Sequence, residues 1–206
     1  MFVILPFEKE FYKKHNYKVS FVGHPLIDGI AGREQVSEKK FREENQLNNK
    51  PIIALLPGSR KQEITKMLSV MVSLVDDFSE YQFVIAGAPS QDFSFYQQII
   101  GNRKVNFINN KTYDLLSISY AALVASGTAT LETALFKVPQ VVCYKGGTIS
   151  YQIAKRIITL KFISLVNLIM DKEVVKELIQ NDFNKKNLKD ALTKILDEKH
   201  RGKLFF

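Results

Sequence analysis

The sequence predicts an α/β protein built on a doubly wound parallel sheet. Short runs that are apolar at every position recur along the chain, for example 52–56 (IIALL) and 121–125 (AALVA). Amphipathic segments with helical spacing separate these runs. Strands that are apolar on both faces are typical of parallel sheets that helices cover on both sides.

The first 50 residues are expected to form two parts. The first part, 1–28, predicts a strand, a helix and a second strand, at 2–5, 6–15 and 18–22. A break should follow, marked by Gly23, Pro25 and Gly29. The second part, 29–50, is polar and in part helical, and we interpret it as a connector.

From residue 51 onward, strands and helices alternate in the pattern of a parallel sheet. Strands are expected at 52–56, 82–88, 105–109, 121–126 and 140–144. The helix that follows the strand at 52–56 should bury one face. That face is formed by Ile64, Met67, Leu68, Met71, Val72, Val75 and Phe78. Further helices are expected at 89–100, 112–120, 128–136, 148–159, 172–181 and 185–199.

Composition favours a globular protein with an anionic partner. Lys and Arg total 29 against 21 Asp and Glu, a net charge of +8, which suits nucleotides, phosphorylated sugars or acidic lipid surfaces. The basic residues occur in scattered pairs without an aromatic stripe, so nucleic acid is the weaker hypothesis. The single cysteine, Cys143, lies in an expected strand, which favours a buried thiol and a reducing cytoplasm. No His, Cys or Asp cluster has metal-ligand spacing, and we expect no metal and no cofactor.

Two strand-to-helix corners stand out as candidate anion sites. At the first, LLPGSRKQEI (55–64), Gly58 would let backbone approach a ligand, Ser59 could cap the helix, and Arg60 could bind phosphate oxygens. Carboxyl ends of parallel strands and the following helix N-termini are where phosphates bind in such sheets. An ordinary capped helix with a solvated arginine explains this corner equally well.

The second corner, ASGTATLE (125–132), is more informative. Gly127 is followed by Thr128, whose hydroxyl could cap the helix or bind a phosphate. Glu132 lies four residues after Thr128, one too many for a capping box, so it lacks that local explanation. It could accept both hydroxyls of a ribose, as acidic residues do in dinucleotide sites. The alternative is a carboxylate favoured by the helix dipole.

The order and spacing of several stretches resemble one known family. The stretches are PFEKEFY (6–12), VSFVGHPLID (19–28), both corners, AKRIITLKFISLVNLI (154–169) and VVKELIQ (174–180). Together they closely resemble the carboxyl-terminal half of the lipid A disaccharide synthases, glycosyltransferases built from two Rossmann-like domains in the GT-B arrangement. In this family UDP-2,3-diacylglucosamine donates its sugar, with inversion, to 2,3-diacylglucosamine 1-phosphate, and UDP is released. One departure is Lys176, where relatives carry proline.

The resemblance implies roles for particular residues. Gly58, Ser59 and Arg60 would lie near the diphosphate of the donor, and Ser126, Gly127 and Thr128 would cradle it. Glu132 would bind the ribose, and Asn167 would lie in a loop beside the donor. His24 is expected to set a turn between domains, with a catalytic base as the alternative.

The resemblance also implies a domain organisation. Residues 1–28 would be a remnant of the N-terminal GT-B domain, 29–50 the connector, and 51–206 the nucleotide-sugar-binding domain. The rest of the first domain, with the general base, would lie outside this chain, so no catalytic residue is assigned. The isolated chain is then expected to bind UDP without catalysing transfer.

Location and alternative functions remain as hypotheses at this point. Residues 150–170 mix apolar and basic side chains and suit either core packing or an anionic membrane surface. The family's lipid substrates favour a peripheral position on the cytoplasmic face of the inner membrane. The alternatives are another UDP-sugar GT-B enzyme, such as the muramyl-pathway N-acetylglucosaminyltransferase or an epimerase, and a non-catalytic nucleotide-binding module.

Overall fold

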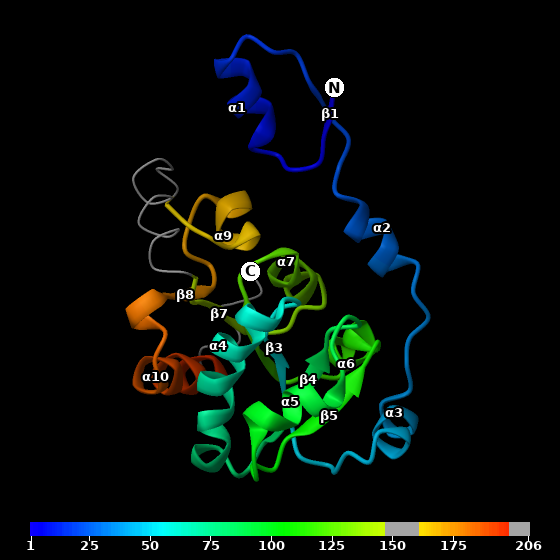
Figure 1. Cartoon of the computed structure of the whole chain (residues 1–206). Coiled ribbons are helices and arrows are strands. Elements are labelled where there is room, and N and C mark those ends of the chain that lie inside the picture. Colours follow the sequence, from blue (N-terminus) through cyan, green and yellow to red (C-terminus); the bar gives the residue numbers. More distant parts are fainter. Residues whose placement is uncertain (147–160, 198–206) are drawn as a thin grey trace.

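The computed structural model describes residues 1–146 and 161–197 of the chain. Its main sheet has six parallel strands in the order β5-β4-β3-β6-β7-β8. Within this sheet, the chain enters in the middle at β3 and continues to one edge through β4 and β5. It then returns to β6, beside β3, and continues through β7 and β8 to the other edge (Figure 1). This confirms the predicted doubly wound α/β fold. The helix expected at 148–159 lies outside the described residues.

The elements of this domain follow the expected alternation. The strands are β3 (Ile52–Leu56), β4 (Gln82–Gly87), β5 (Asn106–Asn109), β6 (Ala121–Ala125), β7 (Gln140–Tyr144) and β8 (Lys176–Ile179). The α-helices are α4 (Lys61–Met71), α5 (Phe93–Ile100), α6 (Thr112–Ser117), α7 (Thr128–Leu135), α9 (Leu165–Met170) and α10 (Lys185–Leu196). Short 3₁₀ helices lie at η1 (Val72–Asp77) and η2 (Gln180–Asp182).

Helices cover both faces of the sheet, with α4 and α10 on one face and α6 on the other (Figure 1), and an apolar layer lies beneath the helices on each face. In β3, Ile53 and Leu55 join the layer under α4, η1, α5 and α10, while Ile52, Ala54 and Leu56 join the layer that contacts α6. All seven residues of the helical face predicted between Ile64 and Phe78 are buried. Burying each such side chain contributes roughly 1.5–3 kcal/mol, so this alternation is the main stabilising feature of the fold.

The break expected after residue 22 is wrong in part. A helix, α2, runs over Pro25–Ala31. The Nδ1 atom of His24 accepts a hydrogen bond from the Leu26 amide at 3.2 Å, and Pro25 occupies the first helical position. A capping side chain followed by proline is a strong helix start, which outweighs the unfavourable Gly29. His24 therefore has a capping role in this structure.

The helix expected at 172–181 is also wrong. The segment Lys176–Ile179 forms the edge strand β8, paired in parallel with β7. Its composition favours a helix, but pairing covers the open edge of β7 and buries Leu178. A helix that the sequence did not predict, α9, lies just before it, and its N-cap Ser164 accepts a hydrogen bond from the Asn167 amide.

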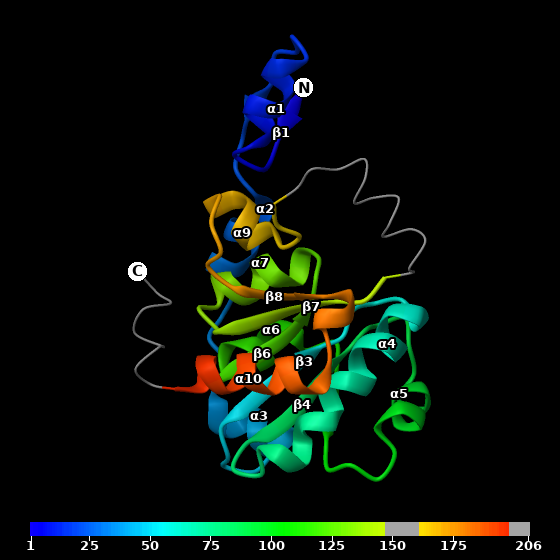
Figure 2. The same cartoon turned by 90° about the vertical axis from the view of Figure 1, so that its left-hand side faces the viewer.

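The first residues form a small unit of their own. Strands β1 (Phe2–Val3) and β2 (Ser20–Phe21) pair in parallel around α1 (Glu8–Lys14). The unit projects away from the main sheet (Figures 1 and 2). Several of its apolar side chains are exposed, namely Phe2, Phe11, Tyr17, Phe21 and Val22. The predicted strand–helix–strand order of residues 1–28 is thus confirmed.

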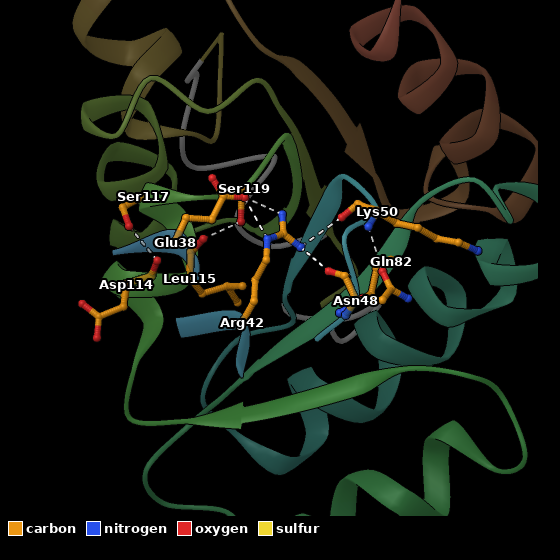
Figure 3. Close-up of polar contacts among 9 residues, drawn as sticks. All are labelled: Glu38, Arg42, Asn48, Lys50, Gln82, Asp114, Leu115, Ser117 and Ser119. Carbon is orange, nitrogen blue, oxygen red and sulfur yellow. Dashed lines mark hydrogen bonds and ion pairs between the residues drawn. The ribbon is translucent and has the colours of Figure 1, made fainter. Parts of the chain in front are cut away.

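The expected connector is firmly docked at its second half. Phe41, in α3 (Glu38–Glu44), is only 2% exposed and packs into the core under the sheet. The guanidinium of Arg42 pairs with Glu38 and donates to the Asn48 carbonyl at 2.6 Å (Figure 3). The Gln82 side chain accepts from the Asn48 amide at 2.8 Å. This part of 29–50 therefore packs as part of the domain that follows it.

Candidate functional site

The site lies where the strand order reverses. Strands β3 and β6 are neighbours although two strands separate them in sequence, and Leu56 lies opposite Val124 at their carboxyl ends. In open parallel sheets this switch point is the place where ligands bind. A cleft of about 340 Å³ opens there.

The cleft brings together seven of the eight predicted site residues. It is lined by Gly58, Ser59, Arg60, Ser126, Gly127, Thr128 and Glu132. Both corners therefore face one space, as the sequence predicted. Further lining comes from the end of β4 and from Glu63, Pro89 and Thr112, none of which the sequence singled out.

The corner after β3 is closed by one of its own side chains. Gly58 has a φ of 100°, a conformation that favours glycine, and an added Cβ would collide with the carboxylate of Glu63. The Oε2 atom of that carboxylate accepts the Ser59 amide at 3.1 Å. The N-cap of α4 is Arg60, so the predicted cap at Ser59 is wrong by one residue. A protein carboxylate thus holds an amide that a bound anion could otherwise use.

Arg60 remains available to a ligand. Its side chain is exposed, and within residues 1–146 and 161–197 it forms no hydrogen bond or ion pair. A guanidinium at the rim of a cleft suits bidentate contact with phosphate oxygens.

The corner after β6 is open. Its N-cap is Gly127 rather than the predicted Thr128, with φ 162° and ψ −163°, which is extended backbone. A Cβ added at Gly127 would meet nothing within 4 Å. The amides of Thr128 and Ala129 belong to the first turn of α7, where N–H groups lack helical partners. Free amides and the positive end of the helix dipole suit an anion.

Ser126 lines the cleft as expected, but its hydrogen-bond donors are engaged within the protein. Its amide donates to the Cys143 carbonyl at 2.9 Å, and its hydroxyl donates to the Ile163 carbonyl at 2.9 Å. Both donors are therefore engaged within the protein. Ser126 lines the cleft while tying this corner to the segment that precedes α9.

The carboxylate of Glu132 is held by a tyrosine. The Tyr113 hydroxyl donates to Oε1 of Glu132 at 3.0 Å. Burial raises the pKa of Tyr113 to about 12, and the hydrogen bond to Glu132 and its negative charge act in the same direction. Tyr113 therefore stays protonated, and stays a donor, throughout the physiological range.

Asn167 is the predicted residue that does not line the cleft. It is fully buried, and its amide nitrogen donates to the Val175 carbonyl and to Glu177, both at 2.8 Å. Its side-chain oxygen accepts the amides of Val174 and Val175. Asn167 therefore holds α9 against the start of β8, and its expected contact with the donor stays a prediction.

Comparisons with known proteins agree with this geometry. The profile of the family described as lipid-A-disaccharide synthetase matches residues 1–204. The chain belongs to this family. It is 38% identical to the lipid-A-disaccharide synthase of Syntrophus aciditrophicus over 98% of its own length, and 37% identical to that of Hahella chejuensis over 99%.

Solved structures share the fold of this lipid-A-disaccharide synthase family member. A UDP-N-acetylglucosamine 2-epimerase of Listeria monocytogenes, described as putative, matches 98% of the chain and 52% of its own, with a TM-score of 0.67 at 15% identity. The Methanocaldococcus jannaschii epimerase solved with UDP-GlcNAc and UDP gives 0.64 at 14% identity, over 97% of this chain and 55% of that one. A Streptomyces nogalater glycosyltransferase gives 0.51 at 15% identity, over 96% and 55%. At such identities the likeness shows the fold alone.

The chain spans about half the length of the curated relatives it matches, 55% of the Syntrophus protein and 53% of the Hahella protein. The matched region includes both corners of the cleft and the small unit at residues 1–28.

The structure also bears on the single cysteine, on membrane-spanning helices and on metal ligands. Cys143 is fully buried in β7, and burial raises the pKa of its thiol far above the usual range, so the expected buried role is confirmed. Over the part of the chain that the structure describes, no helix is long and apolar enough to cross a membrane. Over that same part, no group of three His, Cys, Asp or Glu is placed to hold a metal ion.

Sequence reasoning missed Glu63 and Tyr113 for different reasons. Glu63 lies three residues after the N-cap Arg60, at the position of a capping-box glutamate, so a local signal existed. Tyr113 lies 19 residues before Glu132 and on another helix, so only the folded chain brings them together.

Proposed function

We propose that this chain is the donor-binding half of a lipid-A-disaccharide synthase and binds the UDP part of UDP-2,3-diacylglucosamine. The observation that carries the proposal is the single cleft at the switch point, which contains Arg60 at one corner and Glu132 at the other. A cation and open helix amides match a diphosphate, and a carboxylate at the far side matches a ribose diol.

In the proposed reaction, a hydroxyl oxygen of 2,3-diacylglucosamine 1-phosphate attacks the anomeric carbon of the donor sugar. The bond from that carbon to the diphosphate oxygen breaks, UDP leaves with the electron pair, and the acceptor's proton passes to a base outside this chain. Arg60 and the N-terminus of α7 would stabilise the charge that develops on the diphosphate. Interactions that strengthen as the charge develops accelerate the transfer step.

We further propose that residues 1–28 belong to a second α/β domain that completes the enzyme. Two parallel strands with exposed Phe2 and Phe21 do not form a stable unit by themselves. A second domain would cover these side chains, and the relatives have the additional length to supply one. The cleft would then lie between two domains, where the acceptor could enter.

A peripheral position at the cytoplasmic face of the inner membrane is part of the same proposal. Both substrates would carry acyl chains, so the cleft must open near a lipid surface. Arg60, Lys61, Lys66 and Lys145 line a neighbouring depression and would attract anionic headgroups. Residues 150–160 of the candidate membrane stretch at 150–170 lie outside the described residues.

Calorimetric titration of the chain with UDP, AMP and inorganic phosphate tests the donor site. We expect UDP to bind most tightly and to lose most of its affinity in Arg60→Ala and in Glu132→Ala. Preference for AMP, or UDP binding that survives both substitutions, would contradict the proposal. Lys104→Ala removes an exposed cation at the opposite end of the sheet and serves as the charge-matched control.

An activity assay separates an enzyme half from a stand-alone nucleotide-binding module. We expect the chain alone to form no disaccharide. The same chain extended at its amino end with the N-terminal half of the Syntrophus relative should transfer the acylated sugar. A fusion that folds and binds UDP without turnover would favour the non-catalytic module.

A further inference from the structure

Three side chains connect the first half of the connector to the carboxylate in the cleft. The Tyr113 hydroxyl donates to Glu132, and the guanidinium of Arg33 lies 5.1 Å from the centre of the Tyr113 ring. Arg33 in turn forms a 2.6 Å ion pair with Asp114, the next residue of α6. Arg33 thus contacts two consecutive residues of the helix that carries the tyrosine.

Tyr113 and Glu132 line two different hollows. One is the cleft that Glu132 lines. The other, of about 460 Å³, lies between the connector and α6 and is lined by Ile30, Arg33, Val36, Tyr113 and Phe136 among others. The ring of Tyr113 also packs against Phe136 of the α7 segment, with centroids 5.5 Å apart. The hydroxyl therefore reaches from the connector side to the carboxylate.

We propose that Tyr113 is a positioning residue that fixes the Glu132 carboxylate for the diol of the donor nucleotide, and that Arg33 of the connector holds Tyr113 in place. This inference rests on the proposed function, because it assigns the supporting contacts of the same donor site. It adds that a segment outside the sheet contributes to nucleotide recognition.

The physical reason is preorganisation. A glutamate side chain has three rotatable bonds, and fixing them on binding costs conformational entropy. A hydrogen bond to Oε1 fixes them beforehand and leaves Oε2 without a hydrogen bond among the described residues. Each carboxylate oxygen accepts more than one hydrogen bond, so Oε1 can bind a ribose hydroxyl as well.

Arg33 limits the freedom of the tyrosine in the same way. A guanidinium over an aromatic ring contributes modestly at an exposed site, and its ion pair with Asp114 restricts its own motion. Lys111, at the start of α6, is paired with Glu44 of α3 at 3.2 Å. The connector therefore contacts α6 on both sides of Tyr113. We expect its docking to affect the position of the Glu132 carboxylate through Tyr113.

The test is a titration of the full chain with UDP and with 2′-deoxy-UDP. Tyr113→Phe should lower the affinity for UDP by about 3- to 10-fold, the range expected for one hydrogen bond. It should change the affinity for 2′-deoxy-UDP clearly less, because that ligand lacks one of the hydroxyls that Glu132 would bind. Arg33→Ala should act in the same direction with a smaller factor.

A double-mutant cycle shows whether Tyr113 acts through the carboxylate. In the Glu132→Ala background, Tyr113→Phe should cause almost no further loss, because the acceptor of its hydrogen bond has been removed. Tyr17→Phe removes an exposed hydroxyl from the unit at residues 1–28 and should be neutral. Equal losses for UDP and 2′-deoxy-UDP, or additive losses in the cycle, would overturn the positioning role. An Arg33→Ala protein with unchanged selectivity would overturn the part assigned to the connector.

The outcomes separate this inference from the proposed function. Wild-type chain that binds no UDP would contradict the donor site itself. Wild-type chain that binds UDP and discriminates against 2′-deoxy-UDP, with a neutral Tyr113→Phe, would contradict only the positioning role. Circular dichroism and thermal melts of each variant show whether a loss of binding comes from loss of folding.

Discussion

The two corners of the cleft, after β3 and after β6, are similar in sequence and different in structure. Each has a glycine between a buried strand and a helix, followed closely by a hydroxyl side chain. At the first corner, Gly58 has a positive φ and Glu63 occupies the space beside it. At the second, Gly127 is extended and has open space where a Cβ would stand.

This difference indicates which corner should contact the diphosphate by its backbone. The fold itself favours a glycine at Gly58, because its backbone conformation is strained for other residues and the Glu63 side chain would have to shift to admit a Cβ. The fold makes no such demand at Gly127. A glycine that the protein does not need for itself leaves room for a ligand. We therefore assign the amide contacts to the second corner and the side-chain cation, Arg60, to the first.

The largest effect is expected from Arg60→Ala. Hydrogen bonds to charged groups contribute about 1.5–3 kcal/mol, so the affinity for UDP should fall roughly 10- to 100-fold. Thermal stability should stay unchanged, because Arg60 is exposed and unpaired within the described residues. Titration with UDP and with uridine, which lacks the phosphates, measures how much of the lost affinity depends on the diphosphate. A loss that is equal for uridine would place Arg60 away from the phosphates.

Gly58→Ala should destabilise the protein. A non-glycine residue at a φ of 100° costs of order 1–3 kcal/mol, and Glu63 must also move away from the new Cβ. Urea unfolding measures the loss. Unchanged stability would mean that the first corner relaxes easily, and the contrast with Gly127 would disappear.

Gly127→Ala should have the opposite result. The free energy of unfolding should change by less than about 0.5 kcal/mol, since the backbone is extended and the space is open. The affinity for UDP should fall at least about tenfold, because a methyl group would stand where the diphosphate approaches the backbone. Stable protein with unimpaired UDP binding would remove the diphosphate from this corner.

The smallest effect is expected from Glu63→Gln. The substitution keeps the shape of the side chain but weakens the acceptor for the Ser59 amide, so stability should fall by about 0.5–1.5 kcal/mol. The affinity for UDP should rise by a few-fold, because a negative charge leaves the wall of the cleft. A lower affinity would instead show that Glu63 supports donor binding, for example by holding Gly58 and Ser59 in place.

Much of the site could be predicted because its signals are local. Gly58, Arg60, Gly127 and Glu132 stand at strand-to-helix corners, and adjacent corners of a parallel sheet face the same edge. Features that depend on distant partners could not be predicted in this way. Tyr113 contacts Glu132 across 19 residues, and Asn167 is buried because Val174, Val175 and Glu177 fold back over it.

The sequence alone determined the layered architecture and the location of the cleft, because the period of the apolar residues decides which faces are buried. Only the tertiary structure decided that Lys176–Ile179 is a strand, since the open edge of β7 offers pairing that its helix-forming residues cannot reveal. It also decided which glycine the fold requires. A backbone angle and a neighbouring carboxylate settle that question, and both depend on how the chain packs rather than on the residue itself.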